Sequence, residues 1–180
     1  MEDFDYKKYF DDYCTNSNLN CKLSFEMPDG FEDAFGMYDS CTNTVHINKD
    51  FMKDDSDYKK AFCLFHELRH AEQHSHKEAF SKLIVRALNY DICYNGLCSK
   101  FIDNEWEGQF FDGSEEYFTR LYLSQPHELD ANEFAYQRTK EIFGNSIELE
   151  KMHKFWVPTD IASSQELEKM YNLIDKTFEK

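Results

Sequence analysis

The sequence predicts an α+β fold in which a small antiparallel sheet of about three strands packs on a mainly helical domain. Three short extended runs in the first third of the chain are separated by turn signals. Longer segments with apolar residues at helical spacing follow them. Only three prolines and six glycines interrupt the 180 residues, and no low-complexity linker divides them, so we expect a single domain over 1–180.

The extended runs are expected over Lys22–Glu26, Ala34–Tyr38 and Thr44–Asn48. The last of them alternates apolar and polar residues, which is typical of a half-buried strand. Helices are expected over 2–13, from Tyr58 through the HELRH segment, and over 77–90, 114–124, 128–143 and 164–178. The stretch Asn95–Gly113, rich in Gly, Asp and Asn, is expected to be a loop.

Composition argues against several classes of protein. The 35 acidic and 20 basic residues give a net charge of −15, which argues against direct binding to nucleic acid or to a membrane surface. No apolar run approaches the roughly 20 residues of a membrane span. The acidic N-terminus does not resemble a secretory signal, so we expect a cytoplasmic protein. The six cysteines are irregularly spaced in a chain large enough to fold without disulfides, and we expect reduced thiols.

The stretch HELRHAEQHSH, from His66 to His76, contains the pattern H-E-x-x-H. Residues four apart on an α-helix lie about 40° apart on one face, so His66 and His70 can present ring nitrogens to one metal ion. Glu67 projects beside them and can take a proton from a water that attacks a peptide carbonyl. This division of roles is typical of a zinc hydrolase.

A tetrahedral zinc site needs a third protein ligand, and His76 and His74 are the nearest candidates. His76 stands six residues after His70, where the metzincin pattern H-E-x-x-H-x-x-G-x-x-H places its third histidine. That pattern needs a glycine to break the helix, but Gln73 occupies the position among good helix formers. A continuing helix turns His76 about 100° away from the pair and carries His74 about 6 Å beyond His70 along the axis. We therefore expect neither to bind the metal.

A second helix, QPHELDANEFAYQRTK (Gln125–Lys140), offers a glutamate instead. Pro126 stands at a helix start, and Glu128 lies at the edge of the apolar face that follows. Asn132, one turn further, lies on the same side and could hydrogen-bond a ligating histidine. The competing Glu133 points about 140° away, toward solvent. The sequence thus predicts metal ligation by His66, His70 and Glu128.

HELRH followed by E-x-x-A-N-x-F-A resembles the zinc-dependent metallopeptidases of the ImmA/IrrE type, gluzincin-like enzymes found largely in bacteria, phages and mobile elements. The likeness covers roughly 22–143, including the strand TVHIN before the zinc helix. It implies a zincin-like domain with Zn²⁺ on His66, His70 and Glu128 and with Glu67 as the general base. It also implies a protein or peptide substrate, such as a transcriptional regulator. The residues that match in the second helix are Glu128, Ala131, Asn132, Phe134 and Ala135.

The chain departs from that family in three places. The spacing between the two motifs is longer than in the family, so 77–124 is expected to be a helical insertion. A polar segment, YQRTKEIFG, replaces the apolar one that usually follows the second motif. Residues 146–180 are expected to form a C-terminal helical extension.

Two features of the site stay open at the level of sequence. The strand Thr44–Asn48 could receive an extended substrate along an exposed edge, or it could be an ordinary sheet strand. Tyr117, Tyr122 and His127 are all candidates to stabilise the developing oxyanion, and the sequence does not choose among them.

The leading interpretation is an intracellular zinc metallopeptidase that hydrolyses a peptide bond in a specific protein partner. The alternative is a non-enzymatic acidic interaction module, a DNA mimic or partner-titrating protein of a mobile element, with a structural or vestigial zinc site. The net charge of −15 motivates this alternative, although the acidic residues are spread through the chain.

Overall fold

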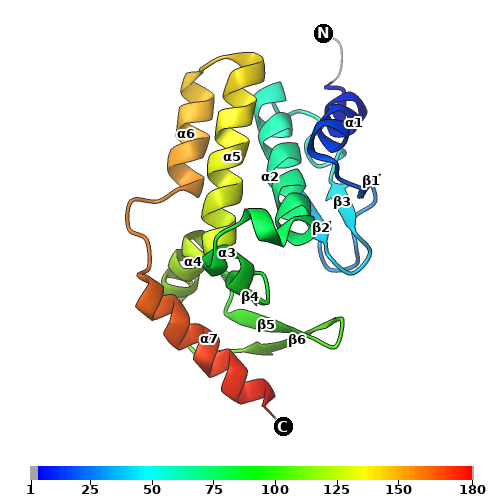
Figure 1. Ribbon diagram of the computed structural model, residues 1–180. Coiled ribbons are helices and arrows are strands. Elements are labelled where there is room, and N and C mark those ends of the chain that lie inside the picture. Colours follow the sequence, from blue (N-terminus) through cyan, green and yellow to red (C-terminus); the bar gives the residue numbers. More distant parts are fainter. Residues whose placement is uncertain (1–3, 180) are drawn as a thin grey trace.

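The three N-terminal extended runs form one sheet in the computed structural model, which describes residues 4–179 (Figure 1). The strands are β1 (Lys22–Ser24), β2 (Gly36–Asp39) and β3 (Thr44–Ile47), in the order β1–β3–β2. β2 runs antiparallel to β3, whereas β1 runs parallel to it. The predicted strand number is confirmed, but the sheet is mixed and not antiparallel. The reason is that the chain reverses twice between β1 and β3 and so regains its first direction.

Most of the remaining chain is helical, which confirms the predicted α+β class. The helix expected over 2–13 begins at Tyr6, and residues 2 and 3 lie outside the described residues. The helix expected over 164–178 has those bounds and starts with a capping box between Ser163 and Glu166. The helical elements are α1 (Tyr6–Ser17), α2 (Asp57–Ser75), the 3₁₀ turn η1 (Lys77–Ala79), α3 (Lys82–Ala87), α4 (Glu115–Ser124), α5 (Pro126–Phe143), α6 (Ile147–Trp156) and α7 (Ser164–Phe178).

A second, antiparallel sheet includes two strands within Asn95–Gly113, which was expected to be a loop, and one strand before it. Its strands are β4 (Tyr90–Ile92), β5 (Leu97–Ile102) and β6 (Glu105–Phe110). Asp103 and Asn104 adopt positive φ angles of 51° and 68°, so these turn residues close a hairpin between β5 and β6. The prediction that 77–124 is a helical insertion is therefore only partly right, because the segment also contains three strands. Nor is 77–90 one helix, because His76 leaves the helical conformation with φ −125° and ends α2.

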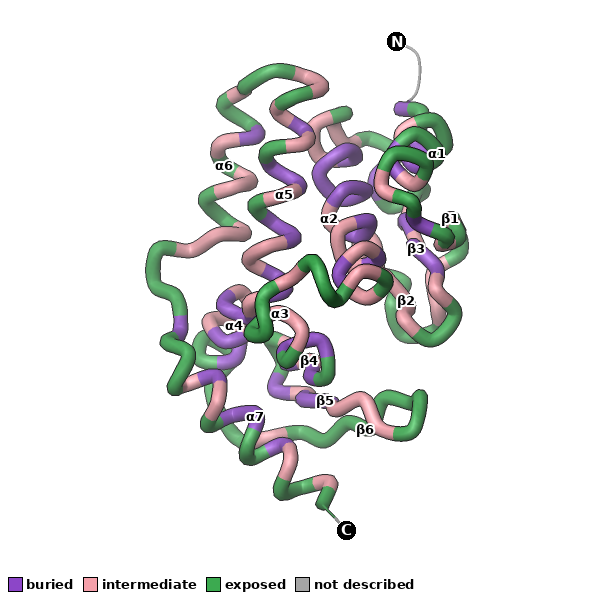
Figure 2. The backbone as a smooth tube through the Cα atoms, in the orientation of Figure 1, coloured by how far each residue is buried: buried purple, intermediate pink, exposed green. Residues whose placement is uncertain are grey.

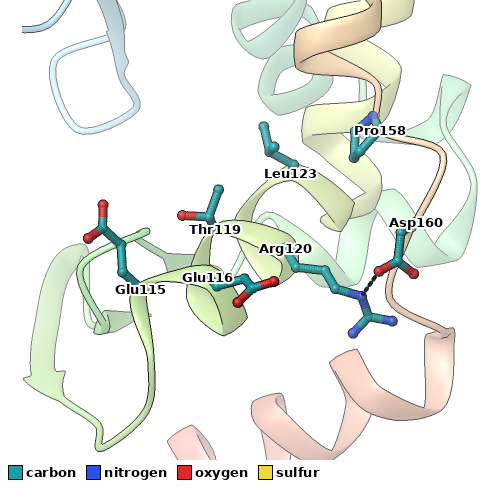
Figure 3. Close-up of a pocket in the computed structure, with 7 residues that line it drawn as sticks. All are labelled: Glu115, Glu116, Thr119, Arg120, Leu123, Pro158 and Asp160. Atoms are coloured by element: carbon teal, nitrogen blue, oxygen red, sulfur yellow. Dashed lines mark ion pairs between the residues drawn. The ribbon is translucent and has the colours of Figure 1, made fainter.

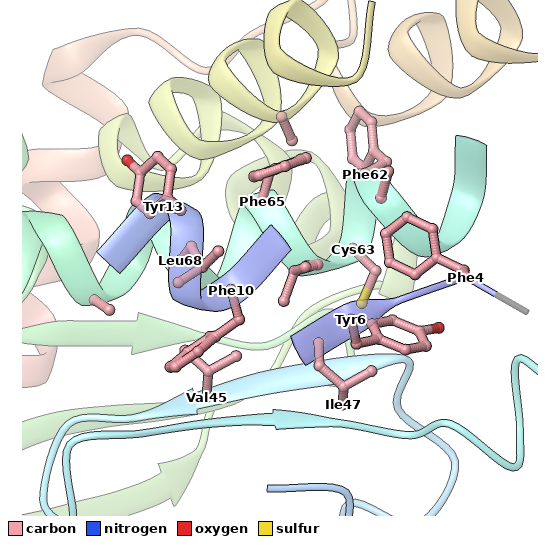
Figure 4. Packing of buried hydrophobic residues seen from close by; sticks show 14 of the residues in the cluster. Phe4, Tyr6, Phe10, Tyr13, Val45, Ile47, Phe62, Cys63, Phe65 and Leu68 are labelled. Carbon is pink, nitrogen blue, oxygen red and sulfur yellow. The ribbon is translucent and has the colours of Figure 1, made fainter. Parts of the chain in front are cut away.

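The buried apolar residues form two clusters. In the first, α2 packs against α1 and the first sheet on one side and against α5 and α6 on the other (Figures 1 and 4). The second cluster lies among α3, α4, α7 and the strands β4 and β5. The described part of the expected C-terminal extension, 146–179, holds the two helices α6 and α7, and it divides between the clusters: Leu149 of α6 joins the first and Ile174 of α7 joins the second.

Helices α3 and α4 of the second cluster contact α5 of the first near its start (Figure 1), and Glu128 lies in that first turn. Figure 2 shows that α2 is buried along much of its length, whereas β6 is exposed throughout. All six cysteines are free thiols. Within residues 4–179, no helix combines the length and apolar character needed to cross a membrane.

Candidate metal centre

Helix α2 brings His66 and His70 together as the spacing predicted. Ser56 caps its N-terminus by accepting a hydrogen bond from the Lys59 backbone N–H, and the helix runs unbroken past Gln73. The two imidazole rings lie edge to face with centroids 4.6 Å apart, and their Nε2 atoms are 3.0 Å apart. Two ring nitrogens therefore converge on one point beside the helix.

Glu128, in the first turn of α5, faces this pair. One carboxylate oxygen lies 3.4 Å from Nε2 of His66, and the other lies 3.4 Å from Nε2 of His70. Helices α2 and α5 make the most extensive contact between elements in the described chain, so the carboxylate is held against the histidines by packing along both helices. Glu133, the competing glutamate, is exposed and bonds to Gln137 and His153.

Glu67 is also buried, and it contacts the first sheet. It offers a ligand atom within 4.8 Å of those of His66 and His70. The backbone N–H of Tyr38 on β2 donates a hydrogen bond to its carboxylate. Gly36 of β2 approaches so closely that a Cβ there would lie 3.0 Å from Cγ of Glu67. Helix α2 thus presents His66, Glu67 and His70 as one potential metal-binding group, with Glu67 directed at the sheet.

Burial and mutual attraction set the charges of these groups. Burial alone would lower the pKa of His70, but the facing carboxylate of Glu128 outweighs it and raises that pKa to about 9. Burial would raise the pKa of Glu128, yet the two histidines hold it well below its usual range. For Glu67, burial prevails over the histidines and raises the pKa. The two carboxyl groups beside the histidines therefore differ: one is firmly ionised and the other takes up a proton more readily.

Of the three oxyanion candidates, the structure brings two to the cluster. Nε2 of His127 lies 3.6 Å from Glu128, and burial lowers the pKa of His127 to about 4. The charge of Glu128, together with burial, raises the pKa of Tyr122 well above its usual value, so its phenol keeps the proton. Tyr117 is 41% exposed and has no such contact among the described residues.

The expected hydrogen bond from Asn132 to a histidine is not present among the described residues. Asn132 is buried, but it donates to the carbonyl of Trp156, because α6 packs against that face of α5. Gln73 takes the expected place instead: its Oε1 lies 2.9 Å from Nδ1 of His70. The spacing of three residues on one helix could have indicated this contact, but the sequence reasoning considered Gln73 only as the residue that replaces a metzincin glycine.

The second sheet adds one more acidic group that sequence reasoning missed. Burial raises the pKa of Asp91 on β4 to about 6, and the charge of Glu128 adds to this effect. The positive charge of His70 acts in the opposite direction and lowers the pKa of Asp91. No sequence signal could have found Asp91, because its strand lies in a segment that was expected to be helical.

His74 and His76 stay outside the site, as expected. The ring of His74 packs at 5.4 Å from that of Tyr38, and burial lowers its pKa to about 3. Nε2 of His76 lies 3.1 Å from the carbonyl oxygen of Ser17. His74 is therefore a packed side chain and not the exposed one that a wet helix face would give.

Of the two interpretations left open for Thr44–Asn48, the structure supports the ordinary sheet strand. β3, which covers Thr44–Ile47, is the central strand and pairs on both sides. A central strand has no free edge for β-addition. β2 is an edge strand that packs against α2 beside Glu67.

A surface hollow of about 440 Å³ lies elsewhere on the molecule (Figure 3). Its one basic side chain is already paired: the guanidinium of Arg120 lies 3.2 Å from Asp160 of the lining and 2.9 Å from Glu166, which lies outside the lining. It shares no residue with the histidine cluster. The residues that line it are Glu115, Glu116, Thr119, Arg120, Leu123, Pro158 and Asp160.

No family model, curated protein or solved structure matches this chain. The resemblance to ImmA/IrrE-type metallopeptidases therefore depends on its sequence motifs. The function is argued below from the geometry of the histidine cluster.

Proposed function

We propose that the protein is a zinc-dependent metallopeptidase that hydrolyses a peptide bond in a protein partner. One observation carries the proposal: Nε2 of His66, Nε2 of His70 and the carboxylate of Glu128 converge at 3.0–3.4 Å. Glu67 lies beside them, with a ligand atom within 4.8 Å of those of His66 and His70. Its carboxylate accepts a hydrogen bond from the edge strand β2.

The convergent atoms fit zinc. Zinc bonds of about 2.0–2.2 Å in a tetrahedron place neighbouring ligand atoms about 3.3–3.6 Å apart. The two nitrogen-to-oxygen distances of 3.4 Å lie in this range, and the distance of 3.0 Å between the ring nitrogens is a little shorter. Two histidines and one glutamate are also a known donor set of catalytic zinc sites, which keep the fourth position open. The donor types and their spacing thus support zinc over a harder cation such as magnesium or calcium.

Glu128 is the better third ligand of the two carboxylates. It comes from a separate helix, and each of its oxygens faces one ring nitrogen. Glu67 follows His66 directly, so its side chain leaves the helix about 100° away from that of His66. Because Glu67 is not a ligand in this proposal, its carboxylate can accept and donate a proton.

In this proposal, His66, His70 and Glu128 hold the metal. The bound zinc supplies Lewis acidity toward a carbonyl oxygen and lowers the pKa of water. The carboxylate of Glu67 takes the proton of the attacking water and hands it to the leaving amine nitrogen. Tyr122, whose phenol keeps its proton, can donate a hydrogen bond to the developing oxyanion.

The edge strand supports a peptide as the substrate. The outward N–H of Tyr38 donates to Glu67, so the edge of β2 and the proton-handling carboxylate are in direct contact. An extended peptide added to this edge would run beside the site, with main-chain hydrogen bonds fixing its register. The sequence resemblance supports a protein partner such as a transcriptional regulator, and the six free thiols support a reducing compartment such as the cytoplasm.

The test combines elemental analysis with the variant Glu67→Gln. The purified parent should hold one zinc per chain and cleave members of a quenched-fluorescence peptide library. Glu67→Gln should retain zinc and lose at least about 10²-fold in cleavage, because the amide cannot accept the proton. A parent without stoichiometric zinc, or a Glu67→Gln variant that cleaves as the parent does, would rule out the proposal.

The acidic interaction module is the second candidate, and the net charge of −15 favours it. It makes a different prediction, because a charged docking surface does not depend on the metal ligands. Capture of a DNA-binding partner that survives His66→Ala, Glu67→Gln and chelation alike, and that weakens with added salt, would support this candidate over the peptidase.

A further inference from the structure

Gln73 uses both ends of its amide in hydrogen-bonding contacts next to the histidine cluster. It is fully buried, at 0% exposure. Its Nε2 donates to the backbone carbonyl of His127 at 2.9 Å and to Oδ2 of Asp130 at 2.8 Å. Its Oε1 lies 2.9 Å from Nδ1 of His70. The amide therefore joins α2 to the first turns of α5 and at the same time touches a proposed ligand.

The two acceptors fix which way the amide points. A flipped amide would put Oε1 against a carbonyl and a carboxylate and leave the buried NH₂ facing His70, which would cost hydrogen bonds that burial makes expensive to lose. Oε1 must therefore face His70 and accept the proton of its Nδ1. With Nδ1 protonated, the lone pair of a neutral His70 ring lies on Nε2, on the side of His66 and Glu128.

Asp130 is itself held in place. Arg69 donates to both of its oxygens, at 2.7 and 3.1 Å, in the two-pronged geometry typical of guanidinium and carboxylate. Arg69 also donates to Glu72 at 2.6 Å, and Tyr13 of α1 donates to the same oxygen at 2.8 Å. A continuous chain of hydrogen bonds thus runs from α1 through α2 and α5 to the ring of His70.

From these contacts we propose that Gln73 is a positioning residue for the metal site, an inference that rests on the proposed zinc function. It selects the tautomer of His70 and fixes the rotation of its ring relative to Glu128, which lies two residues before Asp130 on the same helix. A partner that fixes a ligating histidine commonly contributes about 10–100-fold to metal affinity. Gln73 thus contributes both to the contact between α2 and α5 and to the proposed metal site.

The experiment separates those two duties with variants of the full chain. Gln73→Met keeps the volume and loses both halves of the amide. Gln73→Glu keeps an oxygen for His70 but sets a second carboxylate against Asp130. Gln137→Met, at an exposed position of α5, is the matched control. Zinc affinity is measured by competition with a chromophoric chelator, the ligand geometry by the visible spectrum of the Co²⁺ form, and structural effects by the melting temperature of the metal-free protein.

Gln73→Met should lower zinc affinity by about 10–100-fold and alter the Co²⁺ spectrum. Gln73→Glu should bind zinc at least as tightly as the parent, although its metal-free melting temperature falls. Gln137→Met should change neither. If Gln73→Met does not fold, Gln73→Asn withdraws the same amide by one methylene and should weaken zinc binding likewise.

The inference is overturned if a folded Gln73→Met or Gln73→Asn binds zinc as tightly as the parent with an unchanged Co²⁺ spectrum. It is also overturned if Gln73→Glu loses as much affinity as Gln73→Met, because the oxygen facing His70 would then be irrelevant. A parent that binds neither zinc nor cobalt would instead refute the proposed function itself.

Discussion

Glu128 and Glu67 both lie beside the pair His66 and His70. Glu128 belongs to the contact between α2 and α5, whereas Glu67 belongs to the contact between α2 and the first sheet. Glu128 comes from α5 and lies 3.4 Å from each ring nitrogen, whereas Glu67 contacts the edge strand β2. Both are buried, so their difference comes from their neighbours and not from their depth. Opposite charges keep Glu128 ionised, whereas burial favours the protonated form of Glu67. The proposed assignment of Glu128 as ligand and Glu67 as base rests on this difference in contacts.

Removal of Glu128 tests the ligand assignment. Glu128→Ala should lower zinc affinity by more than the 10–100-fold typical of a lost supporting hydrogen bond, because a metal bond itself is lost. Glu133→Ala, which removes an exposed glutamate from the same helix, should leave the affinity unchanged. Chelator competition on both variants gives the comparison. Equal affinities for the two would show that the third ligand lies elsewhere.

At the scale of elements, the contact between β2 and α2 sets the position of Glu67. The strand can approach because Gly36 has no side chain. An added Cβ would lie 2.8 Å from Sγ of Cys63 and 3.1 Å from the carbonyl oxygen of His46. The close approach in turn brings the Tyr38 N–H to the Glu67 carboxylate. One glycine thus places an edge strand beside a proposed catalytic group.

Gly36→Ala should therefore destabilise the protein by about 1–3 kcal/mol, the usual cost of forcing an extra group into a packed interior. Urea unfolding monitored by circular dichroism measures this cost. In a Cys63→Ala background the same substitution should cost less, because the nearest clashing atom is gone, with a coupling of about 0.5 kcal/mol or more. Purely additive effects would show that Cys63 does not resist the added methyl group.

At the scale of the whole molecule, the proposed site lies where the two apolar clusters meet. Its proposed ligands come from α2 and α5, and the charge of Glu128 contributes to the raised pKa values of Asp91 on β4 and Tyr122 on α4. A metal ion bound by two helices stabilises the folded state in which those helices are packed. The folding of the chain and the loading of the site should therefore be coupled.

Zinc should raise the melting temperature of the parent, and chelation should lower it. At free zinc of about 1,000 times the dissociation constant, linkage gives about 4 kcal/mol, which is on the order of 10 °C for a chain of this size. Differential scanning fluorimetry in zinc and in a chelator gives the measurement. His66→Ala should abolish the difference, and a parent with the same melting temperature in both buffers would contradict the coupling.

Much of the helical part of this protein could be predicted from local pattern. The helical spacing puts His66 and His70 on one face of α2, and it separates Glu128 from Glu133 on α5. These are statements about residues a turn apart, where the geometry of a helix is fixed. The second sheet was missed because its turn residues, Asp103 and Asn104, signal a reversal without indicating that the flanking segments pair.

The sequence alone determined the α+β class, the histidine pair with its adjacent glutamate, and the helix that carries Glu128. Only the tertiary structure decided that the first sheet is mixed, that β3 is its central strand and β2 an edge strand, and that Gln73 rather than Asn132 contacts His70. The physical reason is the separation along the sequence of the residues that must come into contact. Periodicity along a helix fixes which side chains share a face, whereas the bonds of Gln73 to His127 and Asp130 arise only when helices distant in sequence pack together.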